Sequence, residues 1–467
     1  MTTDPSTLST HDPARDPDVS RFPGAFLWGA ATSAYQIEGG ASEDGRTASI
    51  WDTYAHTPGK THRGDTGDVA CDHYHRWPKD VALIGDLGHN AYRLSVSWPR
   101  LQPGGRGPLD PRGVAFYRSL LERLRSGGVR PFVTLYHWEL PQELEDAGGW
   151  PERETAARFA EFAAATVEAL GDLASDWITL NEPWCQSFLC YYYGSHAPGR
   201  RDLDAAVAAA HHLNLAHGLA VRAIRAARGG MRLGVADILT QVRARTQKPE
   251  DVAAAERVDL NNNRLFLDPV LLGRYPEAID ELYAANGLAD LRRADDEAII
   301  ASPIDFLAVN HYHHMIIEAD ATDPHLGARG EPAEPATTSL NWSVTPDALY
   351  GVLARVQRDY PAIPLYVTEN GASYNDYVDP DGAVRDVERI AYLQGYLGAI
   401  AQAIADGVDV RGYFVWSLLD NFEWGEGYNS RFGIVFVDYG TQRRIPKASA
   451  DWYRDLITRH RRASGSP

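Results

Sequence analysis

Eight short apolar segments that alternate with stretches of helical periodicity constrain the fold of this chain more than any other feature. The apolar segments begin at or lie within residues 26–39, 90–100, 130–141, 177–184, 231–239, 304–314, 365–373 and 410–424. The helical periodicity lies in residues 72–88, 113–129, 152–172, 204–228, 250–263, 276–298, 345–360, 386–406 and 447–462. This alternation predicts an α/β fold of the (β/α)8 TIM-barrel type rather than a doubly wound sheet.

The predicted barrel is a single domain that takes up residues 21–462, because no linker of disordered composition interrupts the alternation. Residues 1–20 are polar and rich in Pro, Asp, Ser and Thr, and they contain no apolar stretch typical of a secretion signal. We expect them to form a disordered leader, and residues 463–467 a disordered tail. Residues 318–340, rich in Ala, Asp, Pro, Gly and Thr, are expected to form a long loop on the active face.

The composition argues against several classes of partner. The formal net charge of −18 and the pI of about 5.3 disfavour binding to nucleic acid through a phosphate-contacting face. No segment reaches the roughly 18 uninterrupted apolar residues that a membrane span needs. The three cysteines cannot all pair, and their spacing matches no zinc site, so a reducing compartment is expected. These features predict a cytoplasmic protein that binds neither membranes nor nucleic acid.

Two of the predicted strands end in a glutamate that is flanked by an asparagine. WITLNEPW (177–184) leads into Asn181 and Glu182, and LYVTENGAS (365–373) leads into Glu369. In a (β/α)8 barrel the carboxyl ends of the strands converge on one face, where active sites are built. A pair of carboxyl groups there is the minimum set for glycosidic bond chemistry. A separation of about 5–5.5 Å gives retention of configuration, and about 6.5–9.5 Å gives inversion.

Other polar and aromatic residues follow the strands in the same way. Nine residues at strand ends or in the loops beyond them are expected to face one pocket: Gln36, His137, Asn181, Glu182, Asn310, Tyr312, Glu369, Trp416 and Glu423. Each alone has an ordinary structural explanation. Their joint position at strand ends favours a catalytic cleft.

The chain resembles a known family, the family 1 glycoside hydrolases, which is the β-glucosidase family. The resemblance runs from about Phe22 to Arg459. It rests on the segments FLWGAATSAYQIEG, YRLSVSWPR, YHWELP, TLNEP, VNHY, VTENG, WSLLDNFEW and GYNSRFGIVFVDYGTQRRIPKASADWY. Each motif is modest by itself, but their number and order identify the chain as a member.

The resemblance implies a role for each matching residue. TLNEP carries the general acid/base, hence Glu182, and TENG carries the nucleophile, hence Glu369, in a retaining mechanism. Arg93 and Tyr312 match residues that contact the nucleophile. Trp416 matches the floor of the −1 site, and Trp342 is expected to stack on the +1 sugar. The full set of expected substrate-binding residues is Gln36, His137, Trp138, Asn181, Asn310, Tyr312, Trp342, Trp416, Glu423, Trp424 and Phe432.

The implied reaction is hydrolysis of the terminal non-reducing β-D-glucosyl residue of β-glucosides or cello-oligosaccharides through a covalent glycosyl-enzyme. β-Galactosides and β-fucosides are also expected substrates, because Gln36 and Glu423 can bond either epimer at C4. The expected partners are therefore small β-linked sugars, in carbohydrate metabolism and the degradation of cellulose and related polysaccharides. No cofactor and no metal is expected. The sequence leaves the oligomeric state open.

The electrostatics of the expected pair follow from its neighbours. A guanidinium at Arg93 should stabilise the carboxylate form of Glu369, as a nucleophile requires. The negative charge on Glu369 should keep Glu182 protonated for the first step. Once Glu369 is esterified this repulsion ends, so Glu182 can act as a base on water. Asn181 is expected to donate to the 2-hydroxyl of the sugar.

Single residues separate this chain from two variants of the family. Glu182 is retained where thioglucosidases carry Gln, which favours O-glycosides. Glu423 and Trp424 are intact and no lysine follows before Lys447, which favours an unphosphorylated sugar. Departures from the common pattern are His311 after the sixth-strand Asn, Asn341 where Gly is common, and VADILTQ (235–241) without the usual Asn. They lie toward the aglycone side and leave the aglycone preference open.

Three other functions fit parts of the pattern. A metal-dependent hydrolase could use His311, His313 and His314, or His73 and His75, but no carboxylate set completes a site. A sugar-binding protein without activity would have lost one of the two glutamates. A transglycosidase with the same two glutamates remains the main alternative, since it differs only in the acceptor. Cys185 and Cys190, close to Glu182, are expected to be packing thiols because no positive group is adjacent in sequence.

Overall fold

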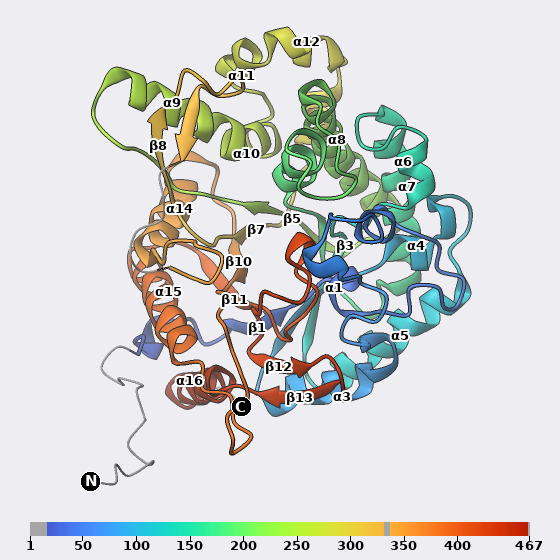
Figure 1. The fold of residues 1–467 in the computed structure, drawn as a ribbon, viewed down its shortest axis with the longest axis vertical. Coiled ribbons are helices and arrows are strands. Elements are labelled where there is room, and N and C mark those ends of the chain that lie inside the picture. The colour runs from blue at the N-terminus through green and yellow to red at the C-terminus, as the bar shows by residue number, and fades with distance from the viewer. Residues whose placement is uncertain (1–15, 331–336, 466–467) are drawn as a thin grey trace.

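Eight parallel strands close into a barrel in the computed structural model, which describes residues 16–330 and 337–465 (Figure 1). Around the barrel their order is β1-β11-β10-β7-β5-β4-β3-β2. Their bounds are β1 Leu27–Ala31, β2 Ala91–Ser95, β3 Arg130–Tyr136, β4 Asp176–Asn181, β5 Arg232–Ile238, β7 Phe306–Asn310, β10 Leu365–Asn370 and β11 Val410–Trp416. The predicted (β/α)8 architecture is confirmed, and all eight strands lie where the apolar segments indicated.

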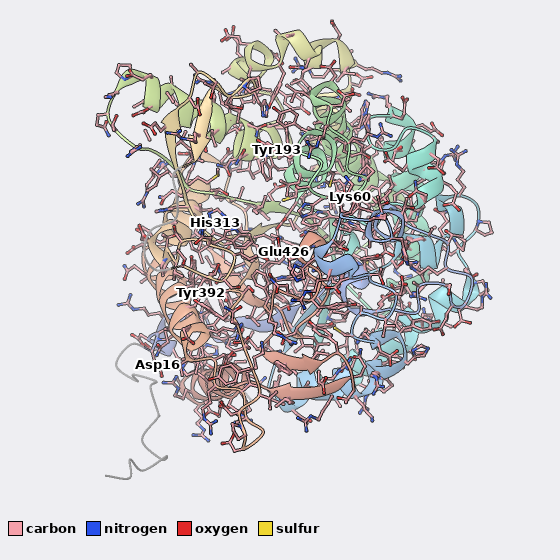
Figure 2. All side chains as sticks on the ribbon, viewed as in Figure 1. Asp16, Lys60, Tyr193, His313, Tyr392 and Glu426 are labelled. Atoms are coloured by element: carbon pink, nitrogen blue, oxygen red, sulfur yellow. The ribbon has the colours of Figure 1, made fainter. Side chains whose placement is uncertain are left out.

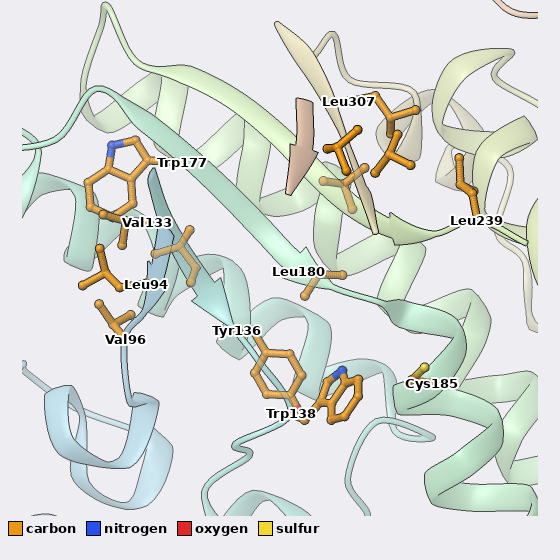
Figure 3. Packing of buried hydrophobic residues seen from close by; sticks show 14 of the residues in the cluster. Leu94, Val96, Val133, Tyr136, Trp138, Trp177, Leu180, Cys185, Leu239 and Leu307 are labelled. Carbon is orange, nitrogen blue, oxygen red and sulfur yellow. The ribbon is translucent and has the colours of Figure 1, made fainter. Parts of the chain in front are cut away.

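The interior of the barrel is filled by side chains. Residues of one parity on each strand point inward, because side chains alternate along a strand. The inward set is Leu27, Ala31, Ala91, Phe132, Ile178, Ala236, Phe306, Ala308, Tyr366, Phe414 and Trp416. The outward residues, among them Val133, Trp177 and Leu307, pack between the strands and the helices (Figure 3). A packed interior leaves only the ends of the barrel for a site.

Long amphipathic helices cover the outside of the barrel (Figure 1). They are α3 His73–Asp86, α5 Pro111–Ser126, α7 Arg153–Leu170, α8 Leu203–Ala227, α14 Pro346–Asp359, α15 Val387–Ala405 and α16 Ala448–Ser464. The helix α9 Pro249–Asp259 packs instead on the small sheet described below. The start of α5 shows why a helix begins at this point of the sequence. Asp110 accepts from the amide of Arg112, and Pro111 occupies the first helical position, where its missing N–H is not needed.

Shorter helices lie in the connections. They are η3 Val19–Arg21, α1 Ala34–Ile37, α2 Ile50–Ala55, η4 His62–Gly64, α4 Trp98–Leu101, η5 Pro103–Gly105, α6 Gln142–Asp146, η6 Cys185–Tyr192, η7 Leu260–Arg264, α10 Leu265–Leu271, α11 Glu277–Leu282, η8 Ala284–Asn286, α12 Leu288–Leu291, α13 Asp296–Ile300 and η9 Trp424–Glu426. The helix expected at 276–298 is thus broken into short pieces. Gly287, with φ of +69°, turns the chain between η8 and α12.

Part of the expected loop 318–340 is a small sheet. β6 Val242–Ala244 pairs with β8 Met315–Ala319, and β8 pairs with β9 Ala328–Gly330. Ile317 and Leu326 pack with α9, so this hairpin has its own small apolar core, which the polar composition did not indicate. Residues 331–336 of the expected loop lie outside the described residues.

The ends of two other predicted segments also differ. The eighth strand, expected over 410–424, stops at Trp416, and the chain then forms a loop before β12 Val435–Asp438 and β13 Arg443–Pro446. Residues 16–20 of the expected leader are packed on the barrel, since Asp16 pairs with Arg459 at 2.7 Å and accepts from Trp452. Residues 1–15 lie outside the described residues, and α16 extends to residue 464 of the expected tail.

None of the helices in the described part of the chain combines the length and the apolar character that crossing a bilayer requires.

Candidate active site

The two glutamates singled out by the sequence lie at the carboxyl ends of β4 and β10. Glu182 directly follows β4 and has a φ of +48°, a left-handed conformation that is strained for a residue with a side chain. Such strain typically costs about 1–3 kcal/mol and clusters at active sites. Glu369 lies within β10 and pairs in register with Asn310 of β7. The backbone therefore brings both carboxyl groups to the same end of the barrel.

The carboxyl group of Glu369 is held on both oxygens. Arg93 of β2 donates from Nη1 to Oε1 at 2.5 Å, and the hydroxyl of Tyr312 donates to Oε2 at 2.7 Å. The predicted contacts of Arg93 and Tyr312 with Glu369 are both present. Arg93 also donates to Oδ1 of Asn181 at 2.6 Å, so one guanidinium connects the ends of β4 and β10.

Glu182 has a neutral partner instead. The amide of Asn310 donates to its Oε1 at 2.7 Å. The same Asn310 amide donates to Asn181 at 3.0 Å. Glu182 thus belongs to the same hydrogen-bonded cluster as Glu369 but has no ion pair of its own within it.

Burial and charge separate the protonation of the two groups. Burial, followed by the negative charge of Glu369, raises the pKa of Glu182 to about 8. Burial also raises the pKa of Glu369, but Arg93 and the hydroxyl of Tyr312 oppose that rise. Arg93 lowers the pKa of Glu369, as expected, but burial raises that pKa by more. At neutral pH the arrangement favours a proton on Glu182 and a charge on Glu369 beside its arginine.

A cavity of about 420 Å³ opens above these groups. Of the residues predicted from the sequence, its wall includes His137, Trp138, Glu182, Tyr312, Trp342, Glu369, Trp416, Glu423, Trp424 and Phe432. The other four, Gln36, Arg93, Asn181 and Asn310, are buried directly behind the wall and hydrogen-bond to it or to one another. The structure therefore brings all of the predicted site residues together.

Aromatic rings line the part of the cavity wall that contains His137, Trp416, Glu423 and Trp424, which we call the inner half. The imidazole of His137 stacks between Trp416 and Trp424, with ring centroids 5.8 and 6.0 Å away. Burial, reinforced by Arg93, holds the pKa of His137 well below its usual range, so the ring is neutral. Burial and the charges of Glu369 and Glu182 raise the pKa of Glu423 to about 8. Gln36 lies 3.4 Å from Glu423.

Trp342 forms one side of the remaining part of the cavity, which we call the outer half. Its ring lies 5.4 Å from Tyr312, 5.3 Å from His313 and 6.0 Å from Phe432. The preceding Asn341 has a φ of +63°, a conformation that glycine adopts freely and that asparagine tolerates better than most residues, so the departure from Gly keeps the same turn.

Several residues of the outer wall were not predicted. They are Trp184, Cys185, Leu189, Ser195, His196, Ile238, His313, Leu340, Gly425 and Glu426. His313 and Glu426, labelled in Figure 2, come from the loops after β7 and β11. Cys185 and Leu189 come from the π-helix η6, a short form that apolar periodicity does not reveal. The one sequence signal that could have placed Cys185 and Leu189 in the cavity wall was their closeness to Glu182 along the chain.

The histidines considered as metal ligands have other partners. His311 bonds the backbone oxygen of Leu239, and His73 bonds Asp80. Between residues 16 and 330 and between 337 and 465, no group of three or more His, Cys, Asp or Glu side chains has a geometry that could hold a metal ion.

A (β/α)8 barrel with two buried glutamates at its strand ends, one of them paired with an arginine, in an aromatic-lined cavity is typical of a glycoside hydrolase. The sequence profile of glycosyl hydrolase family 1 matches residues 19–462. The chain belongs to this family.

Curated relatives and solved structures agree with this assignment. The chain is 46% identical over 462 residues to the bifunctional beta-D-glucosidase/beta-D-fucosidase of Bifidobacterium breve, which covers 94% of this chain and 98% of the relative. It is 42% identical over 440 residues to the 1,4-beta-D-glucan glucohydrolase of Thermotoga neapolitana, with coverage of 94% and 98%. The beta-glucosidase of Thermotoga maritima in complex with deoxynojirimycin superimposes with a TM-score of 0.91 at 43% identity, over 94% of this chain and 99% of that one.

Proposed function

We propose that this protein is a retaining β-glucosidase that removes the terminal non-reducing β-D-glucosyl residue from β-glucosides and short cello-oligosaccharides. One observation carries the proposal most directly. Glu369 is paired with Arg93, whereas Glu182 accepts from the neutral amide of Asn310 and has a pKa raised to about 8. These are the states that a nucleophile and a general acid need at the start of a retaining reaction.

In the first step the carboxylate of Glu369 attacks the anomeric carbon and the glycosidic C–O bond breaks. Glu182 gives its proton to the departing oxygen, so the aglycone leaves as an alcohol. Attack removes the negative charge of Glu369, and the pKa of Glu182 falls because that charge was one of the causes of its rise. In the second step Glu182 takes a proton from water, whose oxygen attacks the anomeric carbon and releases Glu369.

The glycone is proposed to lie in the inner half of the cavity. Trp416 supplies an apolar face for the sugar ring, while His137 and Glu423 reach its hydroxyls from the wall. Asn181, fixed by Arg93 at 2.6 Å, is proposed to bond the 2-hydroxyl. A bond at that position strengthens as the ring becomes oxocarbenium-like, so it accelerates the chemical step as well as binding.

The substrate range is proposed from the same wall and from the relatives. A neutral Glu423 can both donate and accept, so it can bond a C4 hydroxyl of either configuration, which supports activity on β-fucosides and β-galactosides. The Bifidobacterium breve relative is named for both glucosidase and fucosidase activity. The glucan glucohydrolase relative supports a place in the breakdown of cellulose-derived oligosaccharides.

We also propose that the protein works in the cytoplasm. Cys71, Cys185 and Cys190 are all buried and unpaired. Free thiols are typical of proteins in reducing compartments.

The deciding experiment is intact-mass analysis after incubation with an activated 2-deoxy-2-fluoro-β-glucoside, followed by peptide mapping. The fluorine slows both steps, and the good leaving group lets the covalent intermediate accumulate. We expect one fluoroglucosyl group on Glu369, and none on Glu369→Gln. Turnover of an aryl β-glucoside without any adduct would contradict the covalent mechanism. Product analysis at high substrate concentration separates hydrolysis from transfer to a second sugar.

A further inference from the structure

His313 presents an unpaired hydrogen-bond acceptor in the wall of the outer half. It lies in the loop after β7, labelled in Figure 2, and lines the cavity. Its Nδ1 bonds the backbone oxygen of His314 at 2.7 Å. Because a carbonyl oxygen can only accept, Nδ1 carries the ring proton. Burial holds the pKa of His313 below its usual value, so the ring is neutral and its Nε2 is an acceptor.

This Nε2 atom is open to a ligand. Within residues 16–330 and 337–465 no group donates to it. It is also absent from the buried polar atoms that lack a partner, so the side chain reaches the space of the cavity with this nitrogen accessible. The nitrogen therefore forms its hydrogen bond with solvent or with whatever occupies the outer half.

The loop on either side of His313 is held by residues that are not part of the cavity wall. The backbone oxygen of Tyr312 accepts from the hydroxyl of Tyr396 at 2.9 Å, and the amide of His314 donates to Thr345 at 3.3 Å. The imidazole ring itself lies 5.3 Å from the indole of Trp342. The acceptor is thus fixed beside this aromatic face before a ligand arrives, which reduces the entropy cost of binding.

The surroundings of His313 distinguish two kinds of aglycone. The outer half also contains the apolar side chains of Trp184, Leu189, Ile238 and Leu340. An apolar aglycone can contact these groups and Trp342, but it displaces water from Nε2 and gives no donor in return. A sugar ring stacks on the same indole and carries hydroxyl groups that can donate to Nε2. An acceptor that loses water without gaining a donor disfavours the first kind of aglycone.

We propose that His313 determines the aglycone preference of the site, because its Nε2 accepts a hydrogen bond from a hydroxyl group of the sugar that leaves. The inference rests on the proposed glycosidase function, in which the glycone fills the inner half of the cavity. His313 raises kcat/KM selectively for β-glucosides whose aglycone is a second sugar. It takes no part in proton transfer or in the attack on the anomeric carbon.

Two substitutions remove the acceptor in different ways. His313→Phe keeps a flat ring beside Trp342 but has no ring nitrogen. His313→Asn keeps an amide that can donate to His314 in place of Nδ1, but it is too short to place an acceptor at the position of Nε2. His325→Phe is the matched control, because His325 also packs among aromatic rings and is not part of the cavity wall.

The substrates isolate the hydroxyl group concerned. They are methyl β-cellobioside, the derivatives of it that each lack one hydroxyl group of the methyl glucoside unit, and an aryl β-glucoside whose ring carries no hydroxyl group. The quantity measured is kcat/KM, because it includes the first step, in which the aglycone departs.

We expect one of the deoxygenated derivatives to react roughly 3–10-fold more slowly than methyl β-cellobioside with the wild type, the range of a neutral hydrogen bond. With His313→Phe and His313→Asn this derivative should react as fast as methyl β-cellobioside. The ratio of kcat/KM for methyl β-cellobioside to that for the aryl β-glucoside should fall by the same factor in both variants. His325→Phe should leave this ratio and the effect of deoxygenation at their wild-type values.

The two proposals fail in different ways. If every derivative reacts like methyl β-cellobioside with the wild type, or if deoxygenation has the same effect in the wild type and in the His313 variants, the role of His313 is wrong while the glycosidase function stands. A wild type that hydrolyses neither methyl β-cellobioside nor the aryl β-glucoside would overturn the proposed function itself. Since Phe and Asn differ in shape and polarity, one of them keeps the test decisive when the other does not fold.

Discussion

The hydroxyl of Tyr312 donates a hydrogen bond of 2.7 Å to Oε2 of Glu369, on the side of the carboxyl group opposite Arg93. The two donors fix the plane of the carboxylate and lower its pKa against the effect of burial. The attacking oxygen is therefore held in place before a sugar arrives, which is the preorganisation that a nucleophile benefits from.

Tyr312→Phe should separate this contribution from packing. Loss of the hydroxyl removes a bond that stabilises the carboxylate, so the pKa of Glu369 rises and the acid limb of kcat/KM moves to higher pH. We expect kcat/KM at pH 7 to fall by about 10–100-fold, equivalent to roughly 1.4–2.7 kcal/mol. The measurement is a pH profile with an aryl β-glucoside. The control is Tyr360→Phe, which also removes a hydroxyl bonded to a carboxylate, that of Asp268, away from the cavity wall. Equal losses in both variants would contradict a specific role for Tyr312.

The pKa of Glu182 sets the alkaline side of the activity profile. Because the proton on Glu182 is needed in the first step and its pKa is raised to about 8, kcat/KM should fall as the pH passes about 8. Glu182→Gln should lose this limb with an aryl β-glucoside whose leaving group needs the proton. With a substrate whose leaving group needs no proton, added azide should restore turnover of the variant by giving a β-glucosyl azide.

Glu145→Gln is the matched control for that experiment. Glu145 is also a buried glutamate with a raised pKa, but it bonds Tyr191 and Arg200 and is not among the residues that line the cavity. An alkaline limb that disappears in Glu145→Gln would contradict the assignment to Glu182.

The raised pKa of Glu423 predicts a pH-dependent cost in stability. Its folded pKa of about 8 exceeds its unfolded value of about 4.5, so ionisation above pH 4.5 favours the unfolded chain and stability falls as the pH rises toward 8. Glu423→Gln removes this ionisation. We expect its melting temperature to exceed that of the wild type by several degrees at pH 8 and to match it at pH 5.

The same melting curves test whether the effect is local. Glu388→Gln changes an exposed glutamate at the start of α15 and should leave the melting temperature unchanged at both pH values. A gain for Glu423→Gln that is equal at pH 5 and pH 8 would reflect packing instead of ionisation. Activity should fall in Glu423→Gln, which is the usual exchange between stability and function at a site.

The sequence predicted the barrel and the inner half of the cavity for physical reasons. Strands buried on both faces leave an unmistakable apolar signal, and each ends in the polar residue that the barrel then turns toward one face. Glu182 and Glu369 were found in this way. Arg93 could not be found in this way, because a lone arginine inside an apolar strand does not indicate which residue it contacts. Its contact with Glu369 was predicted from the family resemblance.

The outer wall could not be predicted to the same extent. Leu189 and Cys185 depend on the register of a π-helix, which is fixed by packing and not by apolar periodicity. Ile238 and His313 face the cavity because of how β5 and the loop after β7 end. The hairpin of β8 and β9 pairs with β6, which is a long-range contact that local composition does not encode.

Lys447 supports the prediction that phosphorylated sugars are poor substrates. Its ammonium group is fully buried and pairs with Asp376 at 2.5 Å and Asp420 at 2.7 Å, and the described cavity wall contains no Lys or Arg. We therefore expect kcat/KM for an aryl 6-phospho-β-glucoside to be at least about 10³-fold below that for the unphosphorylated glucoside. Lys447→Met should leave two buried carboxylates without their ammonium partner and reduce the free energy of unfolding by about 3–5 kcal/mol, measured by urea unfolding. It should not change the ratio between the two substrates, and a ratio that shifted with Lys447→Met would mean that this lysine reaches the sugar.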